Sequence, residues 1–141
     1  MLKKLLATKD DPSFILIRLM AGVVFLSEGI QKFLFPEKLG AGRFEKIGLP
    51  SPDFLGSFVG ATEILCGMLL LIGFLTRLAA LPLIAIMLVA LATTKLTLLQ
   101  NEGFWAMMHG SRTDWAMLLA NIFLLIRGAG KWSVDFKISR N

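Results

Sequence analysis

The apolar run from Phe54 to Leu75 constrains this chain most, because it carries a single charge, Glu63. A helix rises about 1.5 Å per residue, so a run of this length crosses the hydrocarbon core of a bilayer, about 30 Å thick. Charged side chains are costly in that core and normally face the interior of a helix bundle. We therefore expect Glu63 to point into a bundle that surrounds this helix.

Small residues share the helix face on which Glu63 lies. Gly56, Gly60, Glu63 and Gly67 follow one another at intervals of four, three and four residues, so they fall on one side of a helix that turns about 100° per residue. Small residues allow a second helix to approach closely in lipid. The spacing therefore predicts that another helix packs against this face.

The whole chain reads as an all-α, integral membrane four-helix bundle. It is 55% hydrophobic with a mean hydropathy of +0.70, which is too apolar for an ordinary soluble domain. We expect one membrane domain over residues 1–141, and a first span that is retained because no cleavable signal peptide precedes it. The expected spans are residues 14–35, 54–75, 78–99 and 112–128.

Short polar segments separate the expected spans. Residues 36–53 are rich in glycine, proline and charge, with one short helix expected near Arg43. Residues 100–113 read as a surface or re-entrant loop. Ser13 is the expected N-cap of the first span, and Ser111 with Asp114 fits a capping box before the last.

Basic residues are slightly more numerous in the segments that would lie on the side of the termini. This bias favours a bacterial-type inner membrane location with both termini in the cytoplasm. The net charge of +5 is accounted for by membrane flanks, so no nucleic-acid partner is expected.

A second stripe runs along the first span. Arg18, Gly22, Phe25, Gly29 and Lys32 recur at intervals of four and three residues, and Glu28 precedes Lys32 by one turn. An acid four residues before a base is the favourable order for an ion pair within a helix. The alternative interpretation places Glu28, Gln31, Lys32 and Glu63 around one polar pocket.

Taken in order, several segments resemble the DoxX family of small four-helix membrane proteins. They are RLMAGVVFLSEGIQKF from Arg18, the stretch around Glu63, the turn GFLTRLAA from Gly73, and GAGKWSVD from Gly128. The resemblance covers Arg18 to Asp135 and implies the four-helix fold and a link to thiosulfate:quinone oxidoreductase subunits and oxidative stress. Family members often carry histidine where this chain has Glu28, so a role that needs an imidazole does not transfer.

The candidate ligand-binding residues are polar or charged side chains in or beside the apolar spans: Arg18, Glu28, Gln31, Lys32, Glu63 and Arg77. A quinone head group is the proposed ligand, held by donors and acceptors in the pocket. The structural alternative is that Glu63 only pairs with a base such as Arg18 or Arg77. Lys95 reads as a base that extends to the membrane surface, and Asn121 as an interhelical hydrogen-bond donor.

Metal and redox centres within the chain are not expected. Cys66 is the only cysteine and His109 the only histidine, which excludes an intrachain disulfide, a cysteine-rich iron–sulfur site and a bis-histidine haem. Catalytic residues cannot be assigned. An enzymatic role would therefore be that of a subunit in a quinone-linked oxidoreductase whose electron carrier lies elsewhere.

Three functional hypotheses stay open. The first is a non-catalytic or quinone-facing component of a membrane redox or oxidative-stress system, with partner subunits or a second copy of the chain. The second is a small proton-coupled transporter that uses Glu28. The third is a membrane scaffold or assembly factor, in which the buried charges serve stability alone.

Overall fold

The computed structural model describes residues 4 and 6–140, and every regular element of that part is helical. The predicted all-α fold is confirmed. The long segments of the described chain are α2 (Phe14–Leu34), α5 (Pro52–Ile72), α6 (Thr76–Ala90) continued by η1 (Leu91–Lys95) and α7 (Leu96–Glu102), and α9 (Arg112–Arg127). The shorter helices are α3 (Pro36–Leu39), α4 (Ala41–Lys46), α8 (Phe104–Gly110) and α10 (Val134–Arg140).

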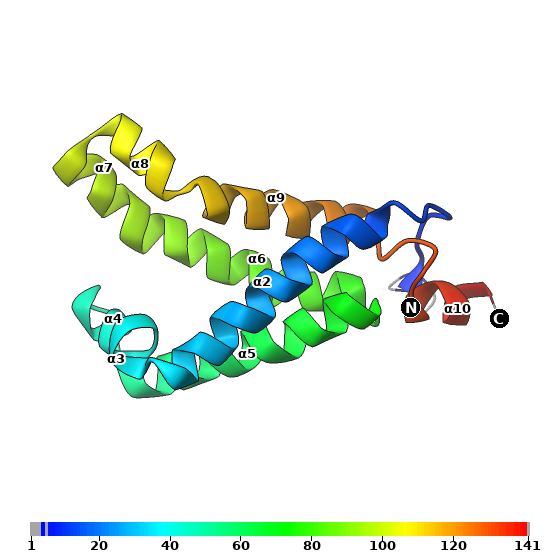
Figure 1. Ribbon diagram of the computed structural model, residues 1–141, viewed down its shortest axis with the longest axis horizontal. Coiled ribbons are helices and arrows are strands. Elements are labelled where there is room, and N and C mark those ends of the chain that lie inside the picture. The colour runs from blue at the N-terminus through cyan, green and yellow to red at the C-terminus, as the bar shows by residue number, and fades with distance from the viewer. Residues whose placement is uncertain (1–3, 5, 141) are drawn as a thin grey trace.

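Three helices of the described residues are long and apolar enough to cross a membrane: Phe14–Leu34, Pro52–Ile72 and Thr76–Glu102. The fourth long segment, α9, has 16 residues, or about 24 Å of helix, which is less than the hydrocarbon thickness of about 30 Å. It packs along α6 (Figure 1). The fourth helix of the bundle is therefore shorter than the others.

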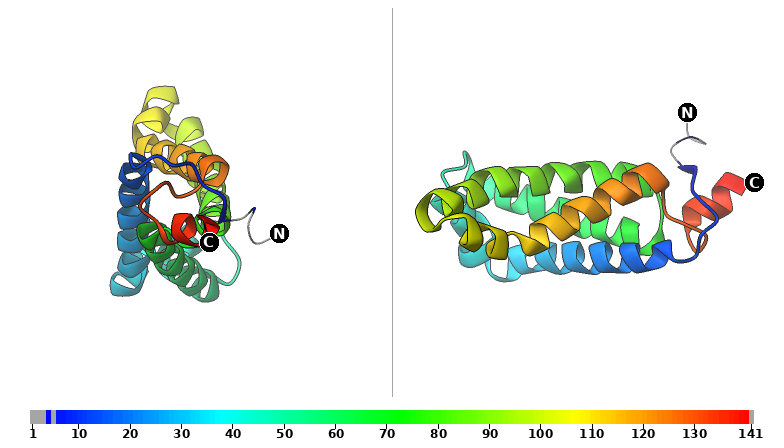
Figure 2. Two further views of the ribbon diagram at one scale, coloured as in Figure 1. Left: turned by 90° about the vertical axis from the view of Figure 1, so that its right-hand side faces the viewer. Right: turned by 90° about the horizontal axis from the view of Figure 1, so that it is seen from above.

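The long helices form two packed pairs, α2 with α5 and α6 with α9 (Figure 1). The short helices α3, α4, α7 and α8 lie at one end, which we call the connection end. The described start of the chain and α10 lie together at the other, the terminal end (Figure 2). Fully buried apolar side chains such as Phe25, Leu70, Leu83 and Leu124 join the two pairs in one core.

The glycine stripes of α2 and α5 face each other, as their spacing predicts. A Cβ atom on Gly29 would lie 2.7 Å from the carbonyl oxygen of Gly60, and one on Gly67 would lie 2.8 Å from the backbone nitrogen of Leu26. Side chains at these positions would collide with backbone, which cannot move aside as a flexible side chain can. The two backbones touch because glycine occupies the contact.

The predicted loop over residues 100–113 is wrong, because most of it is helical. Gly103 has φ +89° and ends α7, and the apolar stretch after it forms α8. The two short helices make a hairpin at the connection end (Figure 1). A short apolar patch inside a polar segment is ambiguous from sequence, since it forms a helix only where it can pack.

Both predicted serine caps are also wrong in their contacts. Ser13 stands at the N-cap position of α2, but its hydroxyl donates to the Asp11 carboxylate at 2.6 Å. Ser111 donates to the sulfur of Met107 at 3.6 Å and makes no capping bond. Asp114 does not complete a capping box, because it forms an ion pair with Lys95.

Candidate functional site

The predicted site residues separate into two groups at opposite ends of the bundle. Arg18 lies near the start of α2 and Lys32 lies 14 residues later in the same helix, about 21 Å along the helix axis. The two groups therefore cannot share one small ligand.

Arg18 closes the terminal end through backbone carbonyls. Its Nε donates to the carbonyl of Leu70 at 2.9 Å and Nη2 to that of Leu71 at 2.8 Å, at the end of α5. Nη1 donates to the carbonyls of Ala129 at 3.1 Å and Trp132 at 2.7 Å. The guanidinium, whose residue is only 2% exposed, thus ties α2, α5 and the segment before α10 together, and four of its five donor hydrogens bind backbone carbonyls.

Asp135 completes the same end with the opposite charge. Its carboxylate accepts the backbone N–H groups of Leu75 at 2.8 Å and Thr76 at 2.9 Å. Those groups lie at the start of α6, where a helix has unpaired donors and favours negative charge. The sequence did not point to Asp135 as a cap, because it lies about 60 residues from the helix that it caps.

Arg77 also binds backbone at the terminal end. Its Nη1 donates to the carbonyl of Leu125 at 3.0 Å and its Nε to that of Ala7 at 3.1 Å. The structure therefore places Arg18 and Arg77 in helix-end contacts, and neither of them is the partner of Glu63. Their assignment to a ligand site stays a prediction, and the geometry gives them a structural role.

Glu63 pairs with Lys32 across the interface of α2 and α5. The Nζ of Lys32 lies 2.7 Å from Oε2 of Glu63, and the two side chains are 11% and 3% exposed. The ion pair with Lys32 is the one polar contact of Oε2 among the described residues. The ion pair expected between Glu28 and Lys32 is wrong, because Lys32 turns to the neighbouring helix instead.

A cavity of about 650 Å³ opens beside this ion pair in the half of the bundle toward the connection end. Lys32 and Glu63 line it together with Glu28, and Arg43 of α4 lines it as well. Most of the remaining wall is apolar, with side chains such as Phe25, Phe44, Phe58, Ile86 and Met117. Gln31 is not part of the wall, since its amide donates to the Ser27 hydroxyl at 2.9 Å.

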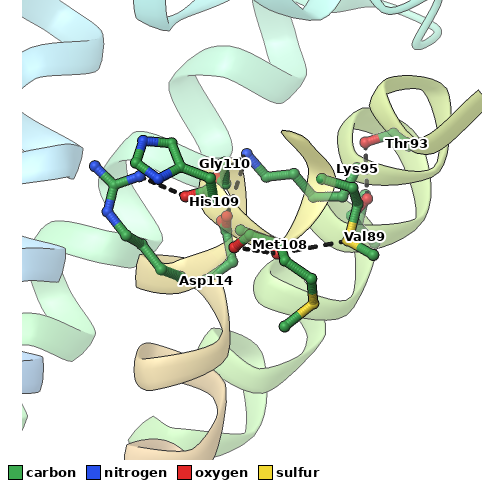
Figure 3. Close-up of polar contacts among 10 residues, drawn as sticks. Val89, Thr93, Lys95, Met108, His109, Gly110 and Asp114 are labelled. Carbon is green, nitrogen blue, oxygen red and sulfur yellow. Dashed lines mark hydrogen bonds and ion pairs between the residues drawn. The ribbon is translucent and has the colours of Figure 1, made fainter. Parts of the chain in front are cut away.

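Sequence reasoning missed a second charged pair in the same cavity wall. Lys95 and Asp114 form an ion pair of 3.2 Å, and both line the cavity. The sequence prediction that Lys95 extends to the membrane surface is wrong, because Asp114 of α9 and the carbonyl of Gly110 in α8 hold its ammonium (Figure 3). The one signal in the sequence was a lone base in the third apolar run.

The remaining polar candidates lie outside the cavity. Asn121 is fully buried, but it donates to the carbonyl of Met117 in its own helix at 2.8 Å and makes no interhelical hydrogen bond among the described residues. His109 is exposed on α8. Within the described residues, no group of three or more His, Cys, Asp or Glu side chains is placed to hold a metal ion.

Comparisons with known proteins agree with the fold. The sequence profile of the DoxX family matches residues 13–96. A protein of Mycobacterium tuberculosis named as an uncharacterized membrane protein is 52% identical, with 97% of this chain and 88% of that protein covered. The Bacillus subtilis protein named "Putative oxidoreductase CatD" is 29% identical, with 90% of each chain covered. No solved structure matches the chain significantly.

Proposed function

This chain belongs to the DoxX family, and we propose that it is a membrane subunit that binds a quinone head group in the cavity beside Lys32 and Glu63. The observation that carries the proposal is a buried ion pair in the wall of a mainly apolar cavity. A quinone has the matching chemistry, because its ring is apolar and its carbonyl oxygens accept hydrogen bonds.

The size and lining of the cavity support this ligand class. Cavities that bind small molecules usually have volumes of about 300–1,000 Å³ and mainly apolar walls with a few polar groups. The ammonium of Lys32 has three donor hydrogens, and its polar contact among the described residues is with one oxygen of Glu63. A ligand carbonyl can therefore be bound without breaking the ion pair.

The outer edge of the cavity supports entry from the lipid. Phe58 of α5 and Val89 of α6 both line the cavity, and they are 57% and 49% exposed on the surface of the bundle. Apolar side chains at this edge suit the passage of a lipid-soluble molecule between the two helices. A strongly polar solute would gain nothing from them.

The redox role is part of the same proposal. A relative that aligns over most of its length carries the word oxidoreductase in its name. This chain would be the quinone-facing component of a membrane redox or oxidative-stress system, with electrons supplied by partner subunits. We place it in the bacterial inner membrane with both termini in the cytoplasm, as the distribution of lysine and arginine favours.

The test is binding of a quinone analogue to the purified chain in detergent. Replacement of Glu63 alone leaves Lys32 buried without its partner, which costs about 3–5 kcal/mol and risks unfolding. The double variant Lys32→Met, Glu63→Leu removes both charges together and is expected to fold. We expect it to bind 1,4-naphthoquinone at least about tenfold more weakly than the wild type, because a hydrogen bond to a charged donor is lost.

The matched control is Glu45→Gln, because Glu45 is exposed on α4 and does not line the cavity. This variant should bind naphthoquinone as the wild type does. Unchanged affinity in a folded Lys32→Met, Glu63→Leu variant would refute the assignment of the head-group site. Thermal unfolding of each variant shows whether the protein is folded under the binding conditions.

A further inference from the structure

The charged pair of Lys95 and Asp114 is fixed by two contacts of the lysine. The Nζ of Lys95 lies 3.2 Å from Oδ2 of Asp114 and donates to the carbonyl of Gly110 at 2.8 Å (Figure 3). The side chains of Lys95 and Asp114 are 14% and 20% exposed. A lysine that only extended to the membrane surface would not be fixed at two points.

The helix that carries Lys95 departs from regular geometry there. Residues Leu91–Lys95 form a turn of π-helix between α6 and α7, and such turns occur frequently at functional sites. The hydroxyl of Thr93 donates to the carbonyl of Val89 at 2.7 Å, which provides a donor to a backbone acceptor near the irregular turn. Thr93, Thr94 and Lys95, which belong to this turn, all line the cavity.

The two ion pairs stand on different walls of one cavity. The first joins α2 to α5, and the second joins the end of η1 to α9. These are the two helix pairs of the bundle (Figure 1), and the cavity is lined by residues of both. Each of the two helix pairs thus contributes one lysine–carboxylate pair to the lining of the cavity.

We propose that Lys95 and Asp114 are a second polar anchor, so that the cavity selects ligands with a hydrogen-bond acceptor at each end of an apolar ring. This inference rests on the proposed function and specifies its ligand class as para-quinones, whose two carbonyl oxygens lie on opposite sides of the ring. Each lysine would donate to one oxygen. A ring with only one carbonyl would leave one of the two ammonium groups without a ligand acceptor.

The chemistry of the two lysines supports this selection. An ammonium group has three donor hydrogens, and the contacts of Lys95 within the described residues use two acceptors, on Gly110 and Asp114. One donor is left in the cavity wall. A site built to donate a hydrogen bond discriminates against an analogue that lacks the acceptor, because the polar group of the protein is then left unpaired.

The experiment compares 1,4-naphthoquinone with 1-tetralone, a bicyclic ketone of the same carbon skeleton that has one carbonyl instead of two and saturated carbons at ring positions 2 to 4, with the full chain in detergent micelles. We expect the wild type to bind naphthoquinone about tenfold to hundredfold more tightly. The double variant Lys95→Met, Asp114→Leu leaves no unpaired buried charge, and we expect it to bind the two compounds within about twofold of each other. The control Lys46→Met changes an exposed lysine that does not line the cavity and should keep the wild-type preference.

The outcomes separate this inference from the proposal on which it rests. If the wild type binds naphthoquinone and the Lys32→Met, Glu63→Leu variant weakens it, but the Lys95 variant keeps the preference over tetralone, the second anchor is refuted and the first stands. If the Lys95 variant loses affinity for both compounds equally and melts earlier, its role is structural and the second anchor is also refuted. If the wild type binds neither compound, both proposals fail.

Discussion

A substitution of Arg18 tests whether the terminal end of the bundle has a structural role only and does not bind the ligand. The four hydrogen bonds of Arg18 all go to backbone carbonyls. The change Arg18→Lys keeps the charge and replaces a fork of five donors by one nitrogen with three. One nitrogen cannot reach carbonyls at the end of α5 and before α10 together. The variant therefore leaves at least one carbonyl unpaired and loses the contacts on one side of the guanidinium.

The size of the loss follows from those contacts. A hydrogen bond to a charged group contributes about 1.5–3 kcal/mol, and we expect two of the four bonds to be lost, since Leu70 and Leu71 lie on one side and Ala129 and Trp132 on the other. The free energy of unfolding should therefore fall by about 4 kcal/mol. Unfolding of the purified protein in mixed micelles, followed by loss of helical circular dichroism, measures the difference.

The matched control is Arg127→Lys, at the same end of the bundle, because Arg127 is exposed and its side chain makes no hydrogen bond within the described residues. It should change the free energy of unfolding by about 0.5 kcal/mol or less. Naphthoquinone affinity should be unchanged in both variants while they are folded. An Arg18→Lys variant of wild-type stability that binds the quinone poorly would show that Arg18 belongs to the ligand site and would refute this reasoning.

Two further perturbations test other contacts. Gly29→Ala places a Cβ atom 2.7 Å from the carbonyl oxygen of Gly60 and should lower the free energy of unfolding by about 2 kcal/mol, whereas Gly110→Ala, whose Cβ meets only the tip of Leu98, should cost much less in the same assay. Hydrogen bonds from Ser13 hold the pKa of the exposed Asp11 carboxyl below its ordinary value of 3.8. A carboxyl whose pKa is lower in the folded state stabilises the protein above its unfolded pKa, and this stabilisation is lost as the pH falls through the folded pKa. Ser13→Ala should therefore reduce the difference in melting temperature between about pH 6 and about pH 3. An unchanged difference would contradict the assignment.

The packing of α2 on α5 could be predicted from sequence, because it depends on short-range spacing. Glycines that recur every three or four residues fall on one helix face wherever the helix is regular. Gly29 and Gly60 meet because each lies in such a stripe. The burial of Glu63 followed from the same wheel, since a charge in a long apolar run has no favourable place except the bundle interior.

The partners of the buried charges could not be predicted in the same way. A pairing of Arg18 with Glu63 is reasonable when only the charges in the sequence are considered. In the structure, the Arg18 side chain donates instead to backbone carbonyls at a helix end, and every residue of any sequence has such a carbonyl. Asp135 binds backbone N–H groups for the same reason. Backbone acceptors and donors leave no trace in the pattern of residue types.

The second ion pair was missed because the helical wheel stops applying before it. The wheel assumes about 100° per residue, and the π-helical turn from Leu91 to Lys95 breaks that rule directly before Lys95. Asp114 lies on another helix, beyond a hairpin that the sequence suggested was a loop. Both errors concern one corner of the bundle, where local irregularity decides which side chains meet.

The buried charges make different kinds of contact at the two ends of the bundle. This contrast favours a ligand site toward the connection end and none at the terminal end. At the terminal end, the side chains of Arg18 and Asp135 form hydrogen bonds with backbone groups. A ligand there would have to compete with contacts that stabilise the fold. Toward the connection end, Lys32 and Lys95 each meet a carboxylate and still have donor hydrogens in the wall of a cavity. Buried ion pairs contribute little net stability, because desolvation offsets their attraction. Charges that hold few backbone groups and line a cavity are therefore the basis on which we propose a bound polar head group at the connection end.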